Sequence, residues 1–353
     1  MTEKEIEHHP DSTSIPPARF FYIDTNGKLS TVSSFKAGLI AAADSGYLWL
    51  DYCDPDLETL QPLISELNIH PLSIEDMLNE DQLPKLDMFS DYSFMIFNIF
   101  ENIDSEVLVN ELDLFIGSNF VISSTKRNQA GQPFLAGFER IAERESQRIK
   151  NGPSFLLHLI IDTMTDRKFE AIDQIEGKLD QDEDEILADS RTFDLFSLMG
   201  SRRSLMTIRK SIFYEREVIS KLIRQDSPFV SDQAVIFFRD VNDHLSRYYE
   251  ISETARDQVT SLMEIHLSMI NNRMAQTSNR TNAIMRRLTL ITTIFMPLTL
   301  IAGIGGMSEF TLLVGEENFR IGYAILFVVM VIIAMVNYLY LKRMEREFTE
   351  EES

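Results

Sequence analysis

The stretch Leu288–Ile304, with the sequence LTLITTIFMPLTLIAGI, is the most informative part of the chain, because its seventeen residues include no charged side chain. A second uncharged stretch, Ile321–Leu341, has twenty-one residues. As helices rising about 1.5 Å per residue, both are long enough to cross the hydrocarbon core of a bilayer. Two buried core helices are the alternative, although uncharged runs of this length are rare in soluble proteins. The pattern predicts membrane-spanning helices at residues 288–306 and 321–341, with a loop at residues 307–320.

Charged residues on either side of these stretches indicate how the chain is oriented. The loop at residues 307–320 carries three acidic residues, Glu309, Glu316 and Glu317. Basic residues lie at the other end of each predicted span: Arg286, Arg287, Lys342, Arg343 and Arg346. Because cytoplasmic flanks are enriched in Lys and Arg, we expect a cell (inner) membrane protein with both termini, including a tail at residues 342–353, in the cytoplasm. The three glutamates would then attract cations to the outer mouth.

The overall charge excludes several classes of protein. The chain has 353 residues, with 33 Lys and Arg against 55 Asp and Glu, and a formal net charge of -22. A nucleic-acid partner is not expected, because the phosphates would be repelled. The single cysteine, Cys53, cannot form an internal disulfide or a cysteine-based zinc site. In contrast, Ile265–Ser308 contains no Asp or Glu, so the first predicted span and its approach are free of acidic residues.

The residues before the first span are expected to fold in the cytoplasm as an α/β domain followed by long helices, which gives an α+β membrane protein overall. Residues 1–17 are polar and contain three prolines, and they are expected to form a disordered arm. Within residues 18–132, helical patterns at residues 57–67 and 71–79 lie among short β-rich runs. These runs are residues 20–24, 47–51, 93–100, 108–116 and 120–123.

Residues 133–287 are predicted to form a helical stalk or funnel. Residues 134–224 and the segment leading to the first span have the pattern of two long amphipathic helices, with a turn at residues 225–231 between them. No Pro or Gly interrupts the second helix between Ser231 and Pro297, so it would extend about 100 Å. A helix of this length needs partners for its apolar stripe, which predicts self-association. An antiparallel helical hairpin within one chain is the alternative.

One face of the first span carries most of its polar residues. Residues spaced alternately three and four apart fall on one stripe of a helix: Asn282, Met285, Thr289, Thr292, Met296, Thr299 and Gly303. A polar helix–helix contact and a pore lining both explain such a stripe. In a pore, Met296 and Leu288 would form an apolar constriction. The stripe has no carboxylate, His or Cys, so a permeant cation would keep much of its water shell, as Mg²⁺ does, whereas Zn²⁺ prefers N and S ligands.

Three separate parts of the chain resemble the CorA family of divalent-cation channels, in matching order and spacing. They are TTIFMP and LTLIAGIGGMS at Thr292–Ser308, HPLSIED and PKLD within His70–Asp87, and FRDV at Phe238–Val241 with Asp243 and His244. One departure from the family concerns the filter. In the family, the filter is Gly-Met-Asn and follows an aromatic residue. Here Gly306, Met307 and Ser308 follow Gly305. A ring of serine hydroxyls is wider and less directional than a ring of asparagine amides.

The resemblance implies a homopentamer in a lipid bilayer, with a central pore lined by the first span. The implied pore residues are Asn282, Met285, Leu288, Thr292, Met296, Thr299 and Gly303. The resemblance also implies a regulatory cation site between subunits at Asp87 and Asp240, beside His244. Mg²⁺ would be both the regulatory and the transported ion. Two facing carboxylates repel each other until a divalent cation bridges them, so loss of the ion would loosen the interface.

Three functional hypotheses remain open on the sequence alone. The leading one is a channel that passes Mg²⁺, or Co²⁺ or Ni²⁺, and is gated by cytoplasmic cation. A zinc transporter of the same architecture is one alternative, and a non-conducting membrane scaffold or sensor is the other. No enzymatic activity is expected, because the sequence shows no nucleophile–base pairing, phosphate-binding glycine loop or metal-ligand cluster.

Overall fold

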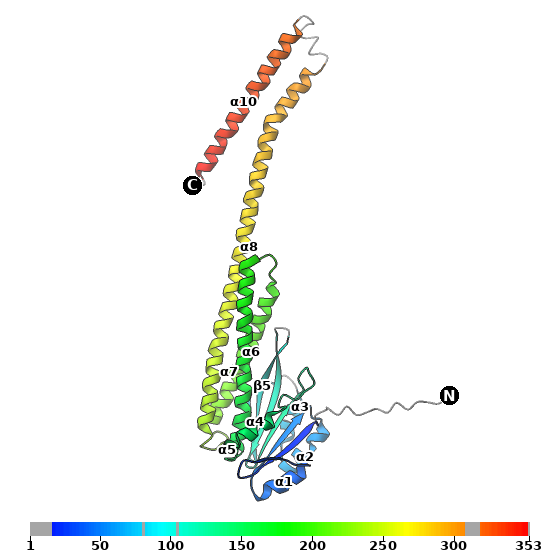
Figure 1. The fold of residues 1–353 in the computed structure, drawn as a ribbon, viewed down its shortest axis with the longest axis vertical. Coiled ribbons are helices and arrows are strands. Elements are labelled where there is room, and N and C mark those ends of the chain that lie inside the picture. The colour runs from blue at the N-terminus through cyan, green and yellow to red at the C-terminus, as the bar shows by residue number, and fades with distance from the viewer. Residues whose placement is uncertain (1–15, 80–81, 104–105, 308–317, 352–353) are drawn as a thin grey trace, which may run out of the picture. The chain divides into compact units, whose positions relative to one another are not determined.

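The computed structural model describes residues 16–79, 82–103, 106–307 and 318–351 (Figure 1). The chain divides into two compact units, Met1–His266 and Leu267–Ser353. The first unit contains a seven-stranded sheet in the order β2-β1-β3-β7-β6-β5-β4, in which β3 and β7 are parallel and the other neighbours antiparallel. The strands are β1 (Ala18–Ile23), β2 (Leu29–Thr31), β3 (Tyr47–Cys53), β4 (Leu86–Met88), β5 (Tyr92–Ile103), β6 (Glu106–Gly117) and β7 (Phe120–Thr125).

Helices cover both faces of this sheet. On one face, α1 (Phe35–Asp44), α2 (Leu57–Leu67) and α3 (Pro71–Leu78) share a core with alternate residues of the central strands, such as Leu48, Leu50 and Tyr52. On the other face, α6 (Pro153–Asp189) and α7 (Leu195–Ile223) pack against β5 and β6 (Figure 1). The short helices α4 (Phe138–Arg144) and α5 (Ser146–Ile149) connect the sheet to α6.

The HPLSIED segment builds the start of α3. His70 is the N-cap, and its Nδ1 accepts a hydrogen bond from the Leu72 backbone N–H at 3.1 Å. Pro71 occupies the first helical turn, where a missing N–H costs nothing. The Tyr92 hydroxyl accepts from the His70 backbone N–H at 3.0 Å and lies 2.9 Å from Ser73 Oγ. These bonds fix α3 against β5, so Asp76 near the end of the helix has a defined position.

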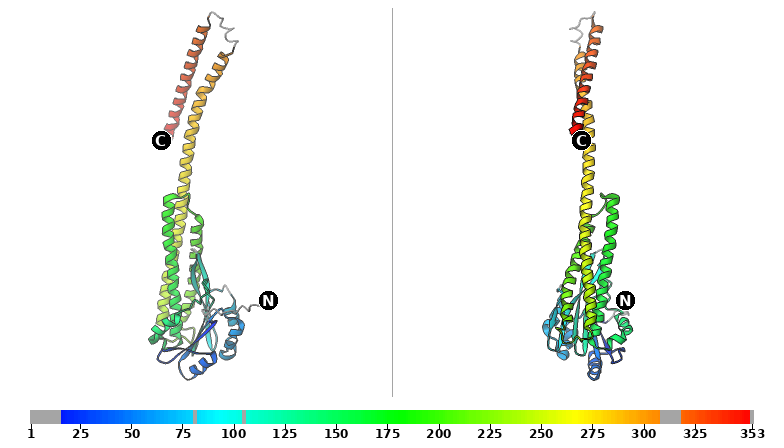
Figure 2. Two further views of the ribbon diagram at one scale, coloured as in Figure 1. Left: turned by 45° about the vertical axis from the view of Figure 1, so that its right-hand side comes forward. Right: turned by 90° about the vertical axis from the view of Figure 1, so that its left-hand side faces the viewer.

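Helix α8 (Val235–Gly305) is continuous over 71 residues, and it runs through Pro297. Its first part is buried within the first unit by α6 and α7, with Phe238, Val241 and Leu245 fully inaccessible. Arg209 on α7 forms an ion pair with Glu253 of α8 at 2.7 Å. After His266, the described residues of α8 are exposed or half-buried up to Gly305. The second unit adds α10 (Phe319–Glu351), which lies beside the last part of α8 (Figures 1 and 2).

The structure confirms the five predicted strands, the helix at residues 57–67 with its bounds, and the long uninterrupted α8. The predicted single helix over residues 134–224 is wrong, because four helices divide it. Gly152 has φ +118°, which L side chains rarely adopt, and Pro153 then begins α6. A loop at residues 190–194 joins α6 to α7, so these two helices form an antiparallel hairpin. The short elements β2, β4 and α1 were not predicted from the sequence.

The predicted domain boundaries stay predictions. Most of the expected arm, residues 1–15, lies outside the described residues. At its end, the Pro17 carbonyl accepts a hydrogen bond from the Cys53 backbone N–H at 2.8 Å, so the chain is already attached to the sheet there.

Candidate ion pathway and cation site

Two described helices, α8 and α10, are long and apolar enough to cross a membrane. In their most apolar windows, only 6% of the α8 residues and 0% of the α10 residues are buried inside the chain. A core helix of a soluble protein would be mostly buried, so this exposure argues against the alternative of two core helices. The two predicted spans therefore coincide with apolar helices that their own chain leaves uncovered.

The seven residues implied to line a pore share one property, which is that all are exposed: Asn282, Met285, Leu288, Thr292, Met296, Thr299 and Gly303. The half-buried or buried residues in the same part of α8 are Leu290, Ile294, Pro297, Leu298, Ile301 and Gly305. At about 100° per residue, these two sets lie on opposite sides of the helix. One side therefore packs within the second unit, and the polar stripe is left free.

Two threonines of this stripe, Thr292 and Thr299, donate their hydroxyl hydrogens within the helix. Thr292 Oγ1 donates to the Leu288 carbonyl at 2.9 Å, and Thr299 Oγ1 donates to the Phe295 carbonyl at 2.8 Å. A hydroxyl that donates to its own helix keeps its oxygen lone pairs for an outside partner. The exposed stripe thus offers acceptor oxygens, which suit a hydrated cation through its water ligands. A shallow groove continues along this face beside Met296, Thr299, Gly303 and Met307.

Gly305 is the last residue on the packed side of α8, directly before the implied filter. It is buried, and a Cβ at this position would clash with Leu326 of α10. The Tyr323 hydroxyl of α10 donates to the Gly305 carbonyl at 2.9 Å. An aromatic side chain from α10 therefore braces the residue directly before the implied filter. The glycine allows this close approach of the two helices.

The implied filter is described only in part. Gly306 donates its backbone N–H to the Ala302 carbonyl at 3.0 Å, and Met307 follows with an exposed side chain. Ser308 and the three loop glutamates, Glu309, Glu316 and Glu317, lie outside the described residues.

Asp87, one of the implied regulatory residues, lies on β4 with its side chain 45% exposed. Its Oδ2 is 3.2 Å from Lys85 Nζ, and the same ammonium lies 2.6 Å from Oδ2 of Asp76. Burial opposes the charge of Asp76, but hydrogen bonds from Lys85 and Gln82 lower its pKa below the usual value. Lys85 thus bridges two carboxylates that come from α3 and β4.

Asp240 and His244 lie together on α8, one helical turn apart. His244 Nε2 is 4.0 Å from Asp240 Oδ1, and the Asp240 side chain is 68% exposed. Asp162 of α6 lies near Asp240 and His244 in the structure. Burial raises the pKa of Asp162, His244 lowers it and Asp240 raises it further. Asp166, one turn along α6, also has a raised pKa, caused by burial and by the charge of Asp162.

The implied cation-binding residues therefore form two separate groups, with Asp87 on β4 and Asp240 and His244 on α8. Among the described residues, no hydrogen bond or ion pair joins Asp87 to Asp240, and no three His, Cys, Asp or Glu side chains gather as a metal-binding group. Sequence reasoning missed Asp162 and Asp166. Their spacing of four residues, which puts both carboxylates on one face of α6, was the available signal.

The chain is similar to known proteins over most of its length. Residues 44–343 match the family described as CorA-like Mg²⁺ transporter protein. The cobalt/magnesium transport protein CorA of Thermotoga maritima is 34% identical over 279 residues, which are 78% of this chain and 76% of that protein. The protein of the same description from Methanocaldococcus jannaschii is 27% identical over 310 residues, covering 86% and 92%.

Solved structures of low identity show the same fold. The CorA magnesium transporter from Methanocaldococcus jannaschii has a TM-score of 0.67 at 24% identity, covering 94% of this chain and 98% of that one. The full-length CmaX protein has a TM-score of 0.67 at 20% identity. The predicted fold class, with an α/β domain, a long stalk helix and two apolar C-terminal helices, is confirmed. Because the family match extends over most of its length, the chain belongs to the CorA-like Mg²⁺ transporter family.

Proposed function

We propose that this chain forms a homopentameric channel that passes Mg²⁺, and also Co²⁺ or Ni²⁺, inward across the cell membrane. The proposal draws on the names of its relatives, which are cobalt/magnesium transport proteins. The observation that carries it is the exposed stripe of α8, opposite the side that packs within the second unit. Five copies of this stripe around one axis would line a pore with hydroxyl oxygens, an amide and apolar methionines.

The chemistry of this pore suits a cation that keeps its water. Thr292 and Thr299 present acceptor oxygens because their hydrogens are bonded to the helix backbone. Such oxygens accept hydrogen bonds from water ligands, and Mg²⁺ gives up its waters reluctantly. Leu288 and Met296, both more than half exposed, would form apolar rings that oppose passage when the pore narrows.

The filter would be a ring made by Gly306, Met307 and Ser308 at the outer end of this pore. Glu309, Glu316 and Glu317 would raise the local cation concentration at its mouth. The basic flanks beyond both spans favour a cytoplasmic location of the two termini. The cation would then pass from the acidic loop toward the helical stalk.

Gating would depend on Asp87 of one subunit and on Asp240 and His244 of its neighbour. Both carboxylates are substantially exposed on the single chain, as an intersubunit site requires. A bound Mg²⁺ would hold the two charged surfaces together, and its loss would let them repel each other. The regulatory and the transported ion would be the same species, so that a high internal concentration closes the channel.

The pattern of burial along α8 independently supports self-association. The helix is covered by its own chain as far as His266, but apolar side chains beyond that point remain uncovered, such as Leu267, Met274 and Ile284. Those before the first span lie outside the bilayer core, so lipid cannot cover them. Neighbouring copies of α8 would bury them, as in a coiled coil.

Two alternatives differ from this proposal in measurable ways. A zinc transporter of the same architecture would move Zn²⁺ in response to a proton gradient, although both relatives named above are described as cobalt/magnesium transport proteins. A scaffold or sensor would conduct nothing, because Ser308 replaces the asparagine of the family filter. An enzymatic role is not proposed.

Flux into proteoliposomes separates these functions. The purified chain would be reconstituted and offered Mg²⁺, Co²⁺, Ni²⁺ and Zn²⁺, each with and without a pH gradient. The channel predicts Mg²⁺ uptake that needs no pH gradient, and proton-coupled Zn²⁺ uptake would favour the zinc transporter. Flux that is absent in the natural chain and appears in Ser308→Asn would favour the non-conducting scaffold.

A further inference from the structure

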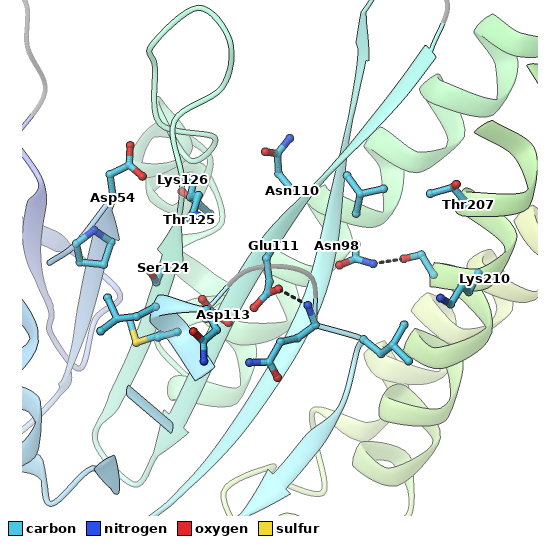
Figure 3. A pocket seen from close by; sticks show the side chains of 18 residues that line it. Asp54, Asn98, Asn110, Glu111, Asp113, Ser124, Thr125, Lys126, Thr207 and Lys210 are labelled. Carbon is cyan, nitrogen blue, oxygen red and sulfur yellow. Dashed lines mark hydrogen bonds between the residues drawn. The ribbon is translucent and has the colours of Figure 1, made fainter. Parts of the chain in front are cut away.

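A pair of acidic side chains lies in a pocket of the first unit. Glu111 and Asp113 are two residues apart on β6, so both side chains point to the same face of the sheet. The pocket has a volume of about 450 Å³ and is lined by the sheet, by the segment that follows α3 and by α7 (Figure 3). Asp113 is only 4% exposed, whereas Glu111 is half-buried. The pair therefore extends from the interior of the sheet toward the opening of the pocket.

The two carboxyl groups form a hydrogen bond with each other. Figure 3 shows them side by side. An ionised carboxylate has no hydrogen to donate, so this bond exists only while one of the two groups carries a proton. Without that proton, Glu111 Oε1 and Asp113 Oδ1 are buried acceptors that have no donor. Because unsatisfied buried acceptors are costly, the arrangement favours one shared proton.

Asp113 is the group that carries this proton. Burial, and then the charge of Glu111 and the hydrogen bond to it, raises the pKa of Asp113 well above its usual value. Burial also raises the pKa of Glu111, but the hydrogen bonds from the Gln82 backbone and from Asp113 lower it. The Gln82 N–H donates to Glu111 Oε2 at 3.0 Å. Asp113 therefore donates as a neutral acid, and Glu111 accepts from both sides as a carboxylate.

Other charged groups also face this pair. Asp76 of α3 raises the pKa of both carboxyls, and Lys126, directly after β7, lowers it. Asp54, which follows β3, and Lys210 of α7 line the same pocket. Since two of these groups are acidic and two are basic, their effects oppose each other. The protonation of the pair then depends mainly on its burial and on the repulsion between its own two charges.

We propose that Glu111 and Asp113 form a proton switch in each subunit, which holds the segment after α3 against β6 while the two carboxyls share one proton. When the proton passes to water, two negative charges are left side by side, and they repel each other. Glu111, the less buried of the two, then turns into the pocket, which has room for about fifteen water molecules at roughly 30 Å³ each. Its hydrogen bond with the Gln82 backbone breaks, and the segment is released.

Gln82 joins this switch to the surface of β4. The Gln82 side chain donates to Asp76 Oδ1 at 2.9 Å. Asp76 is paired with Lys85, which is paired with Asp87. Release of Gln82 therefore changes the surroundings of Asp87, so that cytoplasmic pH as well as Mg²⁺ acts on the gate. This connection rests on the proposed function of Asp87, whereas the proton switch itself does not.

The pH dependence of hydrogen exchange at the Gln82 amide tests the switch in the full chain. Its protection, the ratio of the intrinsic to the observed exchange rate, would be followed by mass spectrometry from about pH 6 to about pH 9, where exposed carboxyls and lysines keep their charges. In the natural chain, protection should be high at the acid end and fall at least about tenfold toward the alkaline end, because the proton that closes the bond is lost there. At the acid end, the infrared absorption of a protonated carboxyl should be present in the natural chain and absent in Asp113→Asn.

Two isosteric variants remove the titration and keep the hydrogen bond. Asp113→Asn and Glu111→Gln each replace a carboxyl with an amide, which donates a hydrogen that it cannot lose in this range. Both should keep Gln82 protected at every pH. Asp54→Asn is the matched control, because Asp54 lines the same pocket but is 48% exposed, and it should behave as the natural chain does.

Protection of Gln82 that does not change with pH in the natural chain would overturn the proposal. The same pH dependence in the natural chain and in folded Asp113→Asn would also overturn it, because another group would then be responsible. Neither result depends on transport, so failure of the switch and failure of the channel are distinguishable.

Discussion

The ammonium group of Lys85 forms an ion pair with Asp87, at 3.2 Å between Nζ and Oδ2. The carboxylate that the proposed gate needs is therefore already partly neutralised within its own subunit. A divalent cation must compete with this lysine for Asp87, which sets the concentration at which the intersubunit site fills.

Replacing Lys85 with methionine should lower that concentration by several-fold. The change removes the positive charge and keeps an unbranched apolar stem, which can still contact Phe94. The measurement is the Mg²⁺ concentration that protects the chain from limited proteolysis. Lys36→Met is the control, because Lys36 pairs with Glu66 at 3.9 Å on the exposed surface and should leave the threshold unchanged. A threshold that rises in Lys85→Met would contradict this account of the pair.

Breaking the buried pair between Lys168 and Glu215 should destabilise the first unit by about 3–5 kcal/mol. Lys168 Nζ is 3.2 Å from Glu215 Oε1 and donates to the Asn98 carbonyl at 2.5 Å, with both side chains fully buried. Lys168→Met leaves Glu215 as an uncompensated buried charge. Urea unfolding can be followed by the fluorescence of Trp49, which is the single tryptophan and is buried in β3.

The double variant Lys168→Met/Glu215→Leu separates charge from packing. Because it removes both charges, it should recover most of the stability lost in Lys168→Met. A double variant that is less stable than Lys168→Met would show that the hydrogen bond which Glu215 Oε1 accepts from the Asn98 backbone N–H dominates.

The stability of the first unit should fall as the pH decreases from about 6.5 to about 4. Burial, reinforced by the charge of Arg148, lowers the pKa of His158 to about 4. The unfolded chain binds a proton near pH 6.5 that the folded chain does not, so stability is full above this range and is lost below it. The loss from this one residue is about 3 kcal/mol at the acid end. His158→Leu should flatten the dependence of the free energy of unfolding on pH between about 4 and 6.5. An unchanged slope would show that His158 does not cause the loss of stability.

The bond from Tyr323 to the Gly305 carbonyl should hold the end of α8 in place. Tyr323→Phe removes one hydrogen bond, worth about 1 kcal/mol, at the residue before the implied filter. We expect the backbone amides of Gly306 and Met307 to exchange hydrogen about fivefold faster, as seen by mass spectrometry in detergent. Tyr338→Phe, on an exposed part of α10, is the control and should not change these rates.

Much of the fold follows from periodicity in the sequence. The bounds of α2 were predictable because Asp56 caps its start and Asn68, with φ 56°, ends it. The apolar runs that became α8 and α10 were visible because they lack charge. The three-residue strands β2 and β4 were not predictable, since they form only where a partner strand already exists.

The candidate site was predictable only where it lies on one element. The stripe of α8 follows from spacing within a single helix, and its common exposure agrees with that spacing. The pairing of Lys85 with Asp76 and Asp87 depends on contacts between α3 and β4, which no local pattern in the sequence shows.

The central claim is that the polar stripe of α8 conducts Mg²⁺, and uptake of Mg²⁺ into proteoliposomes tests it most directly. The double variant Thr292→Val/Thr299→Val keeps the size of both side chains and removes their oxygens. Thr293→Val makes the same change at a threonine that is not one of the stripe residues. The account predicts uptake above that of empty vesicles, strongly reduced in the double variant and unchanged in Thr293→Val. Uptake no greater than in empty vesicles, or equal loss in both variants, would contradict it.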